Sequence, residues 1–168
     1  ALFSLNRLKN VKGNPSSLMN GITVSAPDAG TVVLTTEKPT PQVLAIVTSP
    51  ALGVLNSKLV KANGGSDAVD AKDTDKALDF LKSASVGSGP YTLKSFNLTT
   101  EVVLIKNKKY WGKTQAGYDQ IVVRNVPVNV QRLNVIKGSS SIAVDLSPDQ
   151  ASDVGKLVNV VKGQASNV

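Results

Sequence analysis

Apolar residues recur at helical spacing at the start of the chain. Leu2, Leu5 and Leu8 lie three residues apart, which places them along one face of a helix. Residues 21–26 then alternate apolar and small polar side chains, and residues 31–36 form a β-branched run. A Pro-Asp-Ala-Gly stretch between these two runs supplies turn residues. The pattern predicts a helix followed by a β-hairpin.

Short helical segments are expected next. Residues 42–47 are apolar and follow Pro41, a residue suited to the first helical position. Residues 55–61 form a second short apolar segment. Residues 63–72 are small and polar and predict an exposed loop.

A helix is expected after that loop. Asp73 or Thr74 can cap it, and Asp75 would lie near the positive end of its dipole. Its expected inward face consists of small and branched apolar residues, namely Ala77, Leu78, Leu81 and Ala84.

The second half of the chain begins with three strand-like runs. Residues 91–96, 101–106 and 120–126 are rich in β-branched and aromatic side chains, and a turn at residues 97–100 joins the first two. They predict an antiparallel sheet.

Two helices and two further strands are expected beyond this sheet. Val126, Val130 and Leu133 recur at helical spacing, with Asn129 as a possible cap and Gly138 after the helix end. Residues 142–146 are expected to form a buried strand. Ser147-Pro148-Asp149 then begins a helix whose inward face consists of Ala151, Val154 and Leu157, and residues 158–162 form a final strand.

These elements predict an α+β fold, with a mixed or antiparallel sheet and flanking helices. Residues 1–86 form the portion rich in helices and hairpin, and residues 87–168 form the portion with the sheet and its helices. With 41% hydrophobic residues, the 168-residue chain can bury a proper core.

Composition argues against several classes of function. The net charge of +7 is mild and the lysines are not interleaved with aromatic residues, so nucleic-acid binding is not expected. Histidine and cysteine are absent, which removes the usual general base and the commonest metal ligands. Asp145, Asp149 and Asp153 are spaced like a cluster at a helix start. We expect no enzyme, no catalytic residues, no metal and no cofactor.

Two short motifs stand out. Gly87-Ser88-Gly89-Pro90-Tyr91 lacks the lysine and the following helix of a phosphate loop, so it is interpreted as a tight strand entry whose glycines take positive φ. Tyr110-Trp111-Gly112 contains the single tryptophan of the chain. Trp111 is either a partly buried anchor whose indole N–H reaches a carbonyl or a stacking platform for a ligand.

The order of the motifs resembles the oligopeptide-, dipeptide- and nickel-binding receptors of ABC importers, the family 5 extracellular solute-binding proteins. That family has a GTGPY strand entry, an RNPxYWG strand exit, an IDxIxFRxIP strand and a helix-strand unit ending in GEID. Residues 87–91, 103–112, 118–123 and 131–143 of this chain are similar to them in the same order. Lys108-Lys109 and residues 137–141 depart from the family pattern, which leaves the class of ligand open.

The resemblance implies that this chain belongs to one lobe of a bilobed receptor of type II periplasmic-binding-protein architecture. It would be an internal fragment of that receptor, without the signal segment. Such a receptor is expected to capture a solute, here a peptide, by lobe closure and to present it to a membrane permease. It would be periplasmic or lipid-anchored at the outer face of the cell membrane. The resemblance also implies that Gln164, Ser166 and Asn167 lie close to the solute. Two alternatives stay open: a transport-inactive relative that acts as a cell-surface sensing or interaction module, and a hydrolase that uses lysine or carboxylate.

Overall fold

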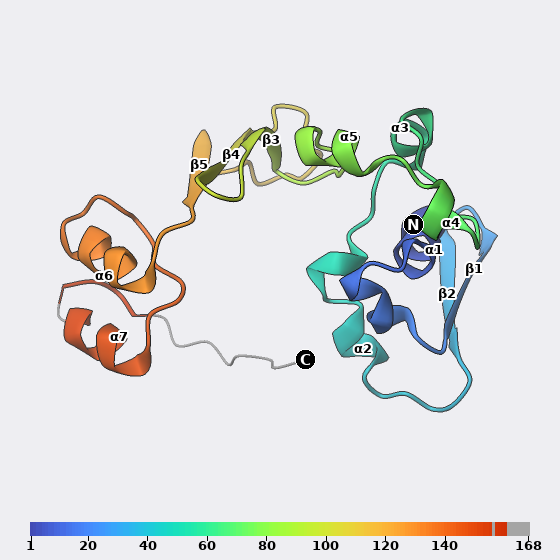
Figure 1. The fold of residues 1–168 in the computed structure, drawn as a ribbon, viewed down its shortest axis with the longest axis horizontal. Helices are drawn as coiled ribbons and strands as arrows, with labels where there is room; N and C mark the ends of the chain where they lie inside the picture. The colour runs from blue at the N-terminus through green and yellow to red at the C-terminus, as the bar shows by residue number, and fades with distance from the viewer. Residues whose placement is uncertain (156, 161–168) are drawn as a thin grey trace. The chain divides into compact units, whose positions relative to one another are not determined.

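The computed structural model describes residues 1–155 and 157–160. It contains two compact units (Figure 1). The first consists of residues 1–96 and 102–122, and the second of residues 97–101 together with the described residues from 123 onward. The expected division into residues 1–86 and 87–168 stays a prediction.

The first helix, α1 (Leu2–Val11), forms where the leucine spacing predicts it. Phe3 and Leu5 are both 7% exposed, yet they belong to different apolar clusters. Because consecutive residues are about 100° apart around a helix, positions 3 and 5 point to nearly opposite sides. Helix α1 therefore contributes to two cores, one around Val60 and the other around Met19.

The predicted hairpin is confirmed. Strands β1 (Ile22–Asp28) and β2 (Thr31–Thr36) pair antiparallel with Ile22 opposite Thr36 and Val24 opposite Leu34. The Asp28 side chain accepts a hydrogen bond from the amide of Gly30 at 2.7 Å, which closes the turn. Ile22 is 2% exposed and anchors the hairpin in the core that contains Met19.

Short helices supply further parts of the two cores. Helices η1 (Asn14–Met19), α2 (Val43–Ile46) and η2 (Pro50–Leu52) contribute to the core that contains Met19, whereas α3 (Ser57–Ala62) contributes Val60 to the other core. The prediction for Pro41 was wrong, because α2 begins two residues later with Gln42 as its N-cap. The Asn56 side chain caps α3 by accepting a bond from the Leu59 amide at 3.2 Å.

The segment after α3 differs from its prediction in two ways. Its loop ends in a short helix, α4 (Ala71–Thr74), in which Ala71 is fully buried. The following helix, α5 (Leu78–Ser83), has Ala77 as its N-cap. Asp73 and Thr74 therefore belong to α4 and do not cap α5. Ala77 and Leu81 pack inward as predicted, but Leu78 is 63% exposed and Phe80 packs inward in its place.

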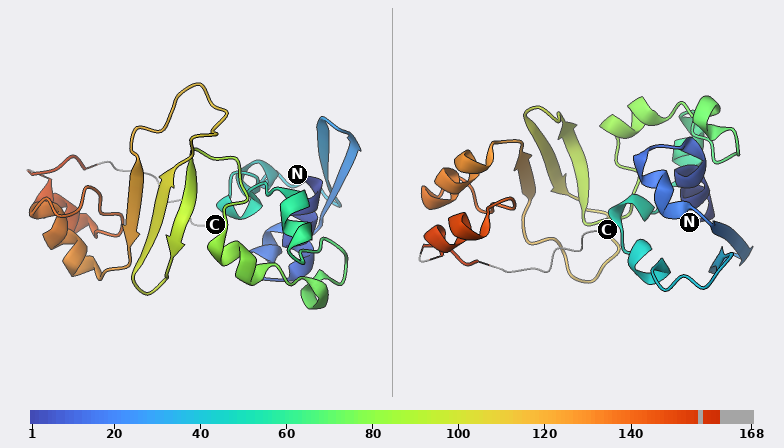
Figure 2. Two further views of the ribbon diagram at one scale, coloured as in Figure 1. Left: turned by 90° about the horizontal axis from the view of Figure 1, so that it is seen from above. Right: turned by 60° about the horizontal axis from the view of Figure 1, so that its bottom comes forward.

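The predicted antiparallel sheet is also confirmed. Strands β3 (Tyr91–Phe96), β4 (Glu101–Lys106) and β5 (Gln120–Arg124) lie side by side in this order (Figure 2). The amide of Lys106 donates to the Asp119 carbonyl and the amide of Asn125 donates to the Thr100 carbonyl, both at 2.9 Å. These bonds join opposite ends of the two segments, as antiparallel pairing requires.

Two helices dominate the second unit. Helices α6 (Val128–Ile136) and α7 (Pro148–Val154) pack against each other (Figures 1 and 2). Helix α7 begins as predicted, with a capping box in which Ser147 and Gln150 bond to each other's backbone. Helix α6 begins after Pro127, so Asn129 is not its cap, whereas Gly138 follows its end at φ 68°.

Two predicted strands are not present in the described residues. Residues 142–146 have no strand partner there, and Ile142 and Val144 are 78% and 80% exposed. The amide of Val144 bonds instead to the Gln131 side chain at 3.4 Å. Residues 158–160 are not in a strand, Leu157 is exposed rather than inward, and residues 161 and 162 lie outside the described part.

None of the helices described is both long and apolar enough to cross a membrane.

Candidate functional site

The predicted solute contacts cannot be compared with the structure. Gln164, Ser166 and Asn167 lie outside the described residues. Their proximity to a solute therefore stays a prediction. The other predicted motifs, in the first unit, are described in full.

The two conspicuous motifs of the sequence lie against each other. The backbone N–H of Asn107 donates to the Pro90 carbonyl at 2.8 Å, and the side-chain amide of Asn107 donates to the Gly89 carbonyl at 2.9 Å. The indole N–H of Trp111 donates to the Ser88 carbonyl at 3.1 Å. Three successive carbonyls of the turn thus hold the segment that follows β4, and sequence reasoning did not foresee this pairing.

The turn before β3 differs from one part of its prediction. Tyr91 does begin the strand, so the interpretation as a strand entry agrees with the structure. Neither Gly87 nor Gly89 takes a positive φ, however. Instead, a Cβ added at either glycine would meet nothing within 4 Å. The turn therefore has no left-handed glycine, and its carbonyls accept hydrogen bonds from the Asn107 and Trp111 side chains.

Trp111 combines features of both alternatives that the sequence left open. Its indole N–H has the carbonyl partner expected of an anchor, but its side chain is 78% exposed. The rings of Tyr110 and Trp111 lie 5.6 Å apart at an angle of 52°. The indole is consequently fixed at one edge and open on much of its surface.

Gly112 allows Tyr110 to fold back over the chain. A Cβ added at Gly112 would lie 2.6 Å from Cζ and 2.7 Å from Oη of Tyr110. We expect Gly112→Ala to displace the tyrosine ring and lower the free energy of unfolding by about 1 kcal/mol. Urea unfolding measures the change. Gly117→Ala is the matched control, since an added Cβ there meets nothing within 4 Å; an equal loss in both variants would contradict the explanation.

The far end of the same segment is fixed to β3. The Tyr91 hydroxyl donates to the Tyr118 carbonyl at 3.1 Å. Within the segment, the Asn107 side chain accepts from the Lys109 amide at 3.0 Å and so forms an Asx turn. That turn is the one local signal from which the role of Asn107 could have been predicted.

The described residues border a shallow hollow in each unit. In the first unit a hollow of about 310 Å³ is bordered by the Gly87-Ser88 turn and by residues 54–56. In the second unit a hollow of about 430 Å³ lies between α6 and α7, and its lining is mostly aliphatic. Asp145 and Asp153 in the second unit bond to Gln131 and Arg132, and Asp149 lies in the first turn of α7, so each has a structural role.

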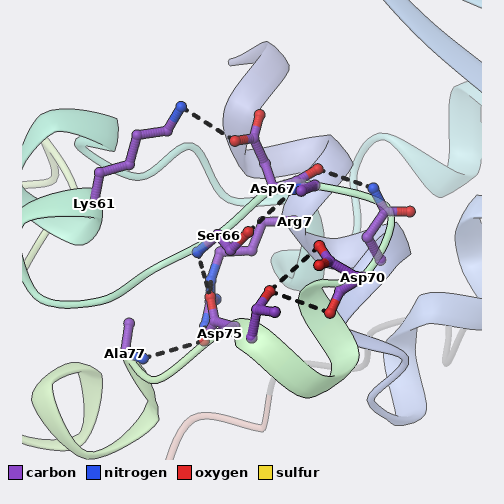
Figure 3. A network of polar contacts seen from close by, with 10 residues as sticks. Arg7, Lys61, Ser66, Asp67, Asp70, Asp75 and Ala77 are labelled. Atoms are coloured by element: carbon purple, nitrogen blue, oxygen red, sulfur yellow. Dashed lines mark hydrogen bonds and ion pairs between the residues drawn. The ribbon is translucent and has the colours of Figure 1, made fainter.

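A buried ion pair supports the first unit. Figure 3 shows Arg7 of α1 reaching Asp75, with N–O distances of 2.7 and 2.8 Å. The amides of Ser66 and Ala77 also donate to this carboxylate, whose side chain is 4% exposed. The pair joins residues 68 positions apart, and sequence reasoning assigned Asp75 only to the helix dipole.

The environment of Asp75 predicts a pH dependence. Burial raises the pKa of Asp75, but the bonds from Arg7, Ser66 and Ala77 outweigh burial and hold the pKa below its usual 3.8. A lowered pKa stabilises the fold above the unfolded pKa, and this stabilisation is lost as the pH falls through the folded pKa. The difference in unfolding free energy between the wild type and Asp75→Asn should be constant from about pH 5 to 7 and shrink below about pH 4. A difference that grows on acidification would contradict the assignment.

Comparison with known proteins identifies the family. The family model described as bacterial extracellular solute-binding proteins, family 5, middle, matches residues 1–168. The probable D,D-dipeptide-binding periplasmic protein of Escherichia coli K12 is 26% identical over 144 residues, which are 85% of this chain and 26% of that protein.

Solved structures confirm the fold. A periplasmic binding protein of Helicobacter pylori in complex with the peptide STSA has a TM-score of 0.68, 24% identity and coverage of 95% of this chain and 32% of that chain. A periplasmic binding protein of A. tumefaciens R10 in complex with agropinic acid has a TM-score of 0.68, 23% identity and coverage of 92% and 29%. The predicted α+β fold of part of one lobe is confirmed, and the chain spans about a quarter to a third of the length of these relatives. The chain belongs to the bacterial extracellular solute-binding proteins, family 5.

Proposed function

We propose that this chain is part of a longer receptor that captures a peptide outside the cytoplasm and delivers it to the permease of an ATP-driven importer. The match of the family model to all of residues 1–168 carries this proposal. The names of two relatives support a peptide as the solute, since one is named a probable D,D-dipeptide-binding protein and the other was solved with the peptide STSA. The receptor lies in the periplasm or is lipid-anchored at the outer face of the membrane.

The mechanism requires binding and movement but no covalent step. Binding energy from the solute stabilises the closed arrangement of two lobes over the open one, and the closed form is presented to the permease. In this chain the carbonyls of Ser88, Gly89 and Pro90 are occupied by bonds from the segment after β4. Because these bonds are already formed, we expect this turn and the segment after β4 to keep their shape during closure. The receptor is not an enzyme.

The solute class is tested by a direct search for bound ligand. Native mass spectrometry of the full-length protein purified from cells should show an added mass that peptide sequencing identifies, and calorimetric titration should then reproduce its binding. Other relatives were solved with agropinic acid or a nickel-histidine complex, so both compounds belong in the titration. Binding of either in place of peptides would overturn the peptide assignment while leaving solute capture intact.

The predicted solute contacts give a second test. Short polar side chains at Gln164, Ser166 and Asn167 suit hydrogen bonds to a peptide main chain. Replacing all three with alanine in the full-length protein should weaken peptide binding at least about tenfold, because each lost bond costs about 0.5–1.5 kcal/mol.

The control for this triple variant is a double variant of exposed polar residues. Gln42→Ala with Ser152→Ala removes similar side chains from positions assigned no role in binding. Calorimetry should give unchanged affinity for this control and an unchanged melting temperature without peptide for both variants. Equal affinities in the triple variant and the wild type would remove these three residues from the site.

A further inference from the structure

Residues 106–119, here named the lysine-tryptophan loop, carry a concentrated positive charge. The loop contains four lysines, at positions 106, 108, 109 and 113, and one acidic residue, Asp119. Its net charge is therefore +3, out of +7 for the chain. Lys108, Lys109 and Lys113 are exposed. Among the described residues none of the four lysines forms an ion pair, whereas Lys61, Lys82 and three arginines do. Within the described residues, the positive charge of these four lysines is therefore not neutralised by an ion pair.

Two aromatic side chains accompany these lysines. Trp111 is 78% and Tyr118 is 74% exposed. The Trp111 side chain is held by the hydrogen bond from its indole N–H to the Ser88 carbonyl, and the Tyr118 backbone carbonyl accepts a bond from the Tyr91 hydroxyl. Because the Trp111 ring is itself already fixed by its indole bond, it loses little conformational entropy when it binds.

This combination fits one kind of partner best. Tryptophan and tyrosine favour the headgroup region of a lipid bilayer, and lysines beside them are attracted to anionic lipids. A nucleic-acid surface would need the same charge, but the proposed setting outside the cytoplasm places a membrane close to this protein. We propose that the lysine-tryptophan loop docks reversibly on anionic phospholipid headgroups at the membrane that holds the permease.

The expected strength of this docking allows the receptor to dissociate from the membrane again. Each lysine near an anionic surface contributes about a fivefold gain in partitioning, so three exposed lysines contribute on the order of a hundredfold. Screening by salt reverses such an attraction. The loop would concentrate the receptor at the membrane without anchoring it there. This inference rests on the extracytoplasmic setting of the proposed function.

Sedimentation of the full-length protein with vesicles tests the proposal. Vesicles of phosphatidylglycerol and phosphatidylcholine should bind the protein at about 0.05 M salt and release it at about 0.5 M, and vesicles of phosphatidylcholine alone should bind far less. Lys108→Gln with Lys109→Gln and Lys113→Gln should lower partitioning on the order of a hundredfold. The matched control replaces the exposed lysines Lys38, Lys58 and Lys72 with glutamine and should keep most of the binding.

Two additional readouts make the result decisive. Brominated lipid should quench the fluorescence of Trp111. The Trp111 signal is identified as the part of the fluorescence that the Trp111→Phe variant lacks. Equal partitioning of the two triple-lysine variants would overturn the proposal, as would full competition by millimolar glycerol phosphate, which would indicate a site for free phosphate. The peptide-induced thermal shift, measured on the same samples, separates failure of this proposal from failure of the proposed function.

Discussion

Replacing Asp75 with alanine will lower the free energy of unfolding by about 3–5 kcal/mol, because it leaves a buried guanidinium without its partner. Arg7 is 14% exposed at its side chain and makes both of its ion-pair bonds to this carboxylate. The same change also removes the acceptor for the amides of Ser66 and Ala77. Urea unfolding of the full-length protein, followed by circular dichroism, measures the loss.

Asp67 provides the matched control for this prediction. It pairs with Lys61 at 3.1 Å, but the two side chains are 28% and 55% exposed. Exposed pairs of this kind contribute about 0.2–1 kcal/mol, so Asp67→Ala should cost less than about 1 kcal/mol. A similar loss in both variants would show that burial of the Arg7–Asp75 pair is not what makes it important.

Replacing Met19 with alanine will cost about 2–5 kcal/mol. Met19 is fully buried, and it packs with Leu5, Ile22 and Leu52, which come from α1, β1 and η2. Truncation leaves a cavity that these separate elements cannot easily close, since each is held by its own hydrogen bonds. The urea midpoint should fall while the slope of the transition stays constant.

Leu44→Ala is the control for the core prediction. Leu44 is 78% exposed, so its truncation should change the unfolding free energy by no more than about 0.5 kcal/mol. A large loss for Leu44→Ala would mean that this face is covered in the longer protein. A small loss for Met19→Ala would contradict the central position of Met19 in the core.

Elements with a strong local pattern could be predicted from the sequence. The leucine spacing of α1, the alternation and turn residues of the β1–β2 hairpin, and the capping signals of α7 all act over a few residues. The interpretation of residues 87–91 as a strand entry depended on the same kind of signal. These local preferences agree with the tertiary structure, so the pattern alone was sufficient.

Features that depend on distant partners could not be predicted. The Arg7–Asp75 pair spans 68 positions, and neither residue carries a signal that points to the other. Residues 142–146 have the apolar pattern of a buried strand, but a strand requires a neighbour with which to pair. Within the described residues no neighbouring strand is present, and Ile142 and Val144 remain exposed.

Thermal unfolding of the full-length protein and of residues 1–168, side by side with a pool of short peptides, tests the central claim most directly. A peptide at one hundred times its dissociation constant should stabilise the full-length receptor by about 2.7 kcal/mol. We predict that the full-length protein shifts and that residues 1–168 alone do not, because the proposed binding site is shared between two lobes. Absence of a shift in the full-length protein would contradict peptide capture, and an equal shift in residues 1–168 would contradict a site shared between lobes.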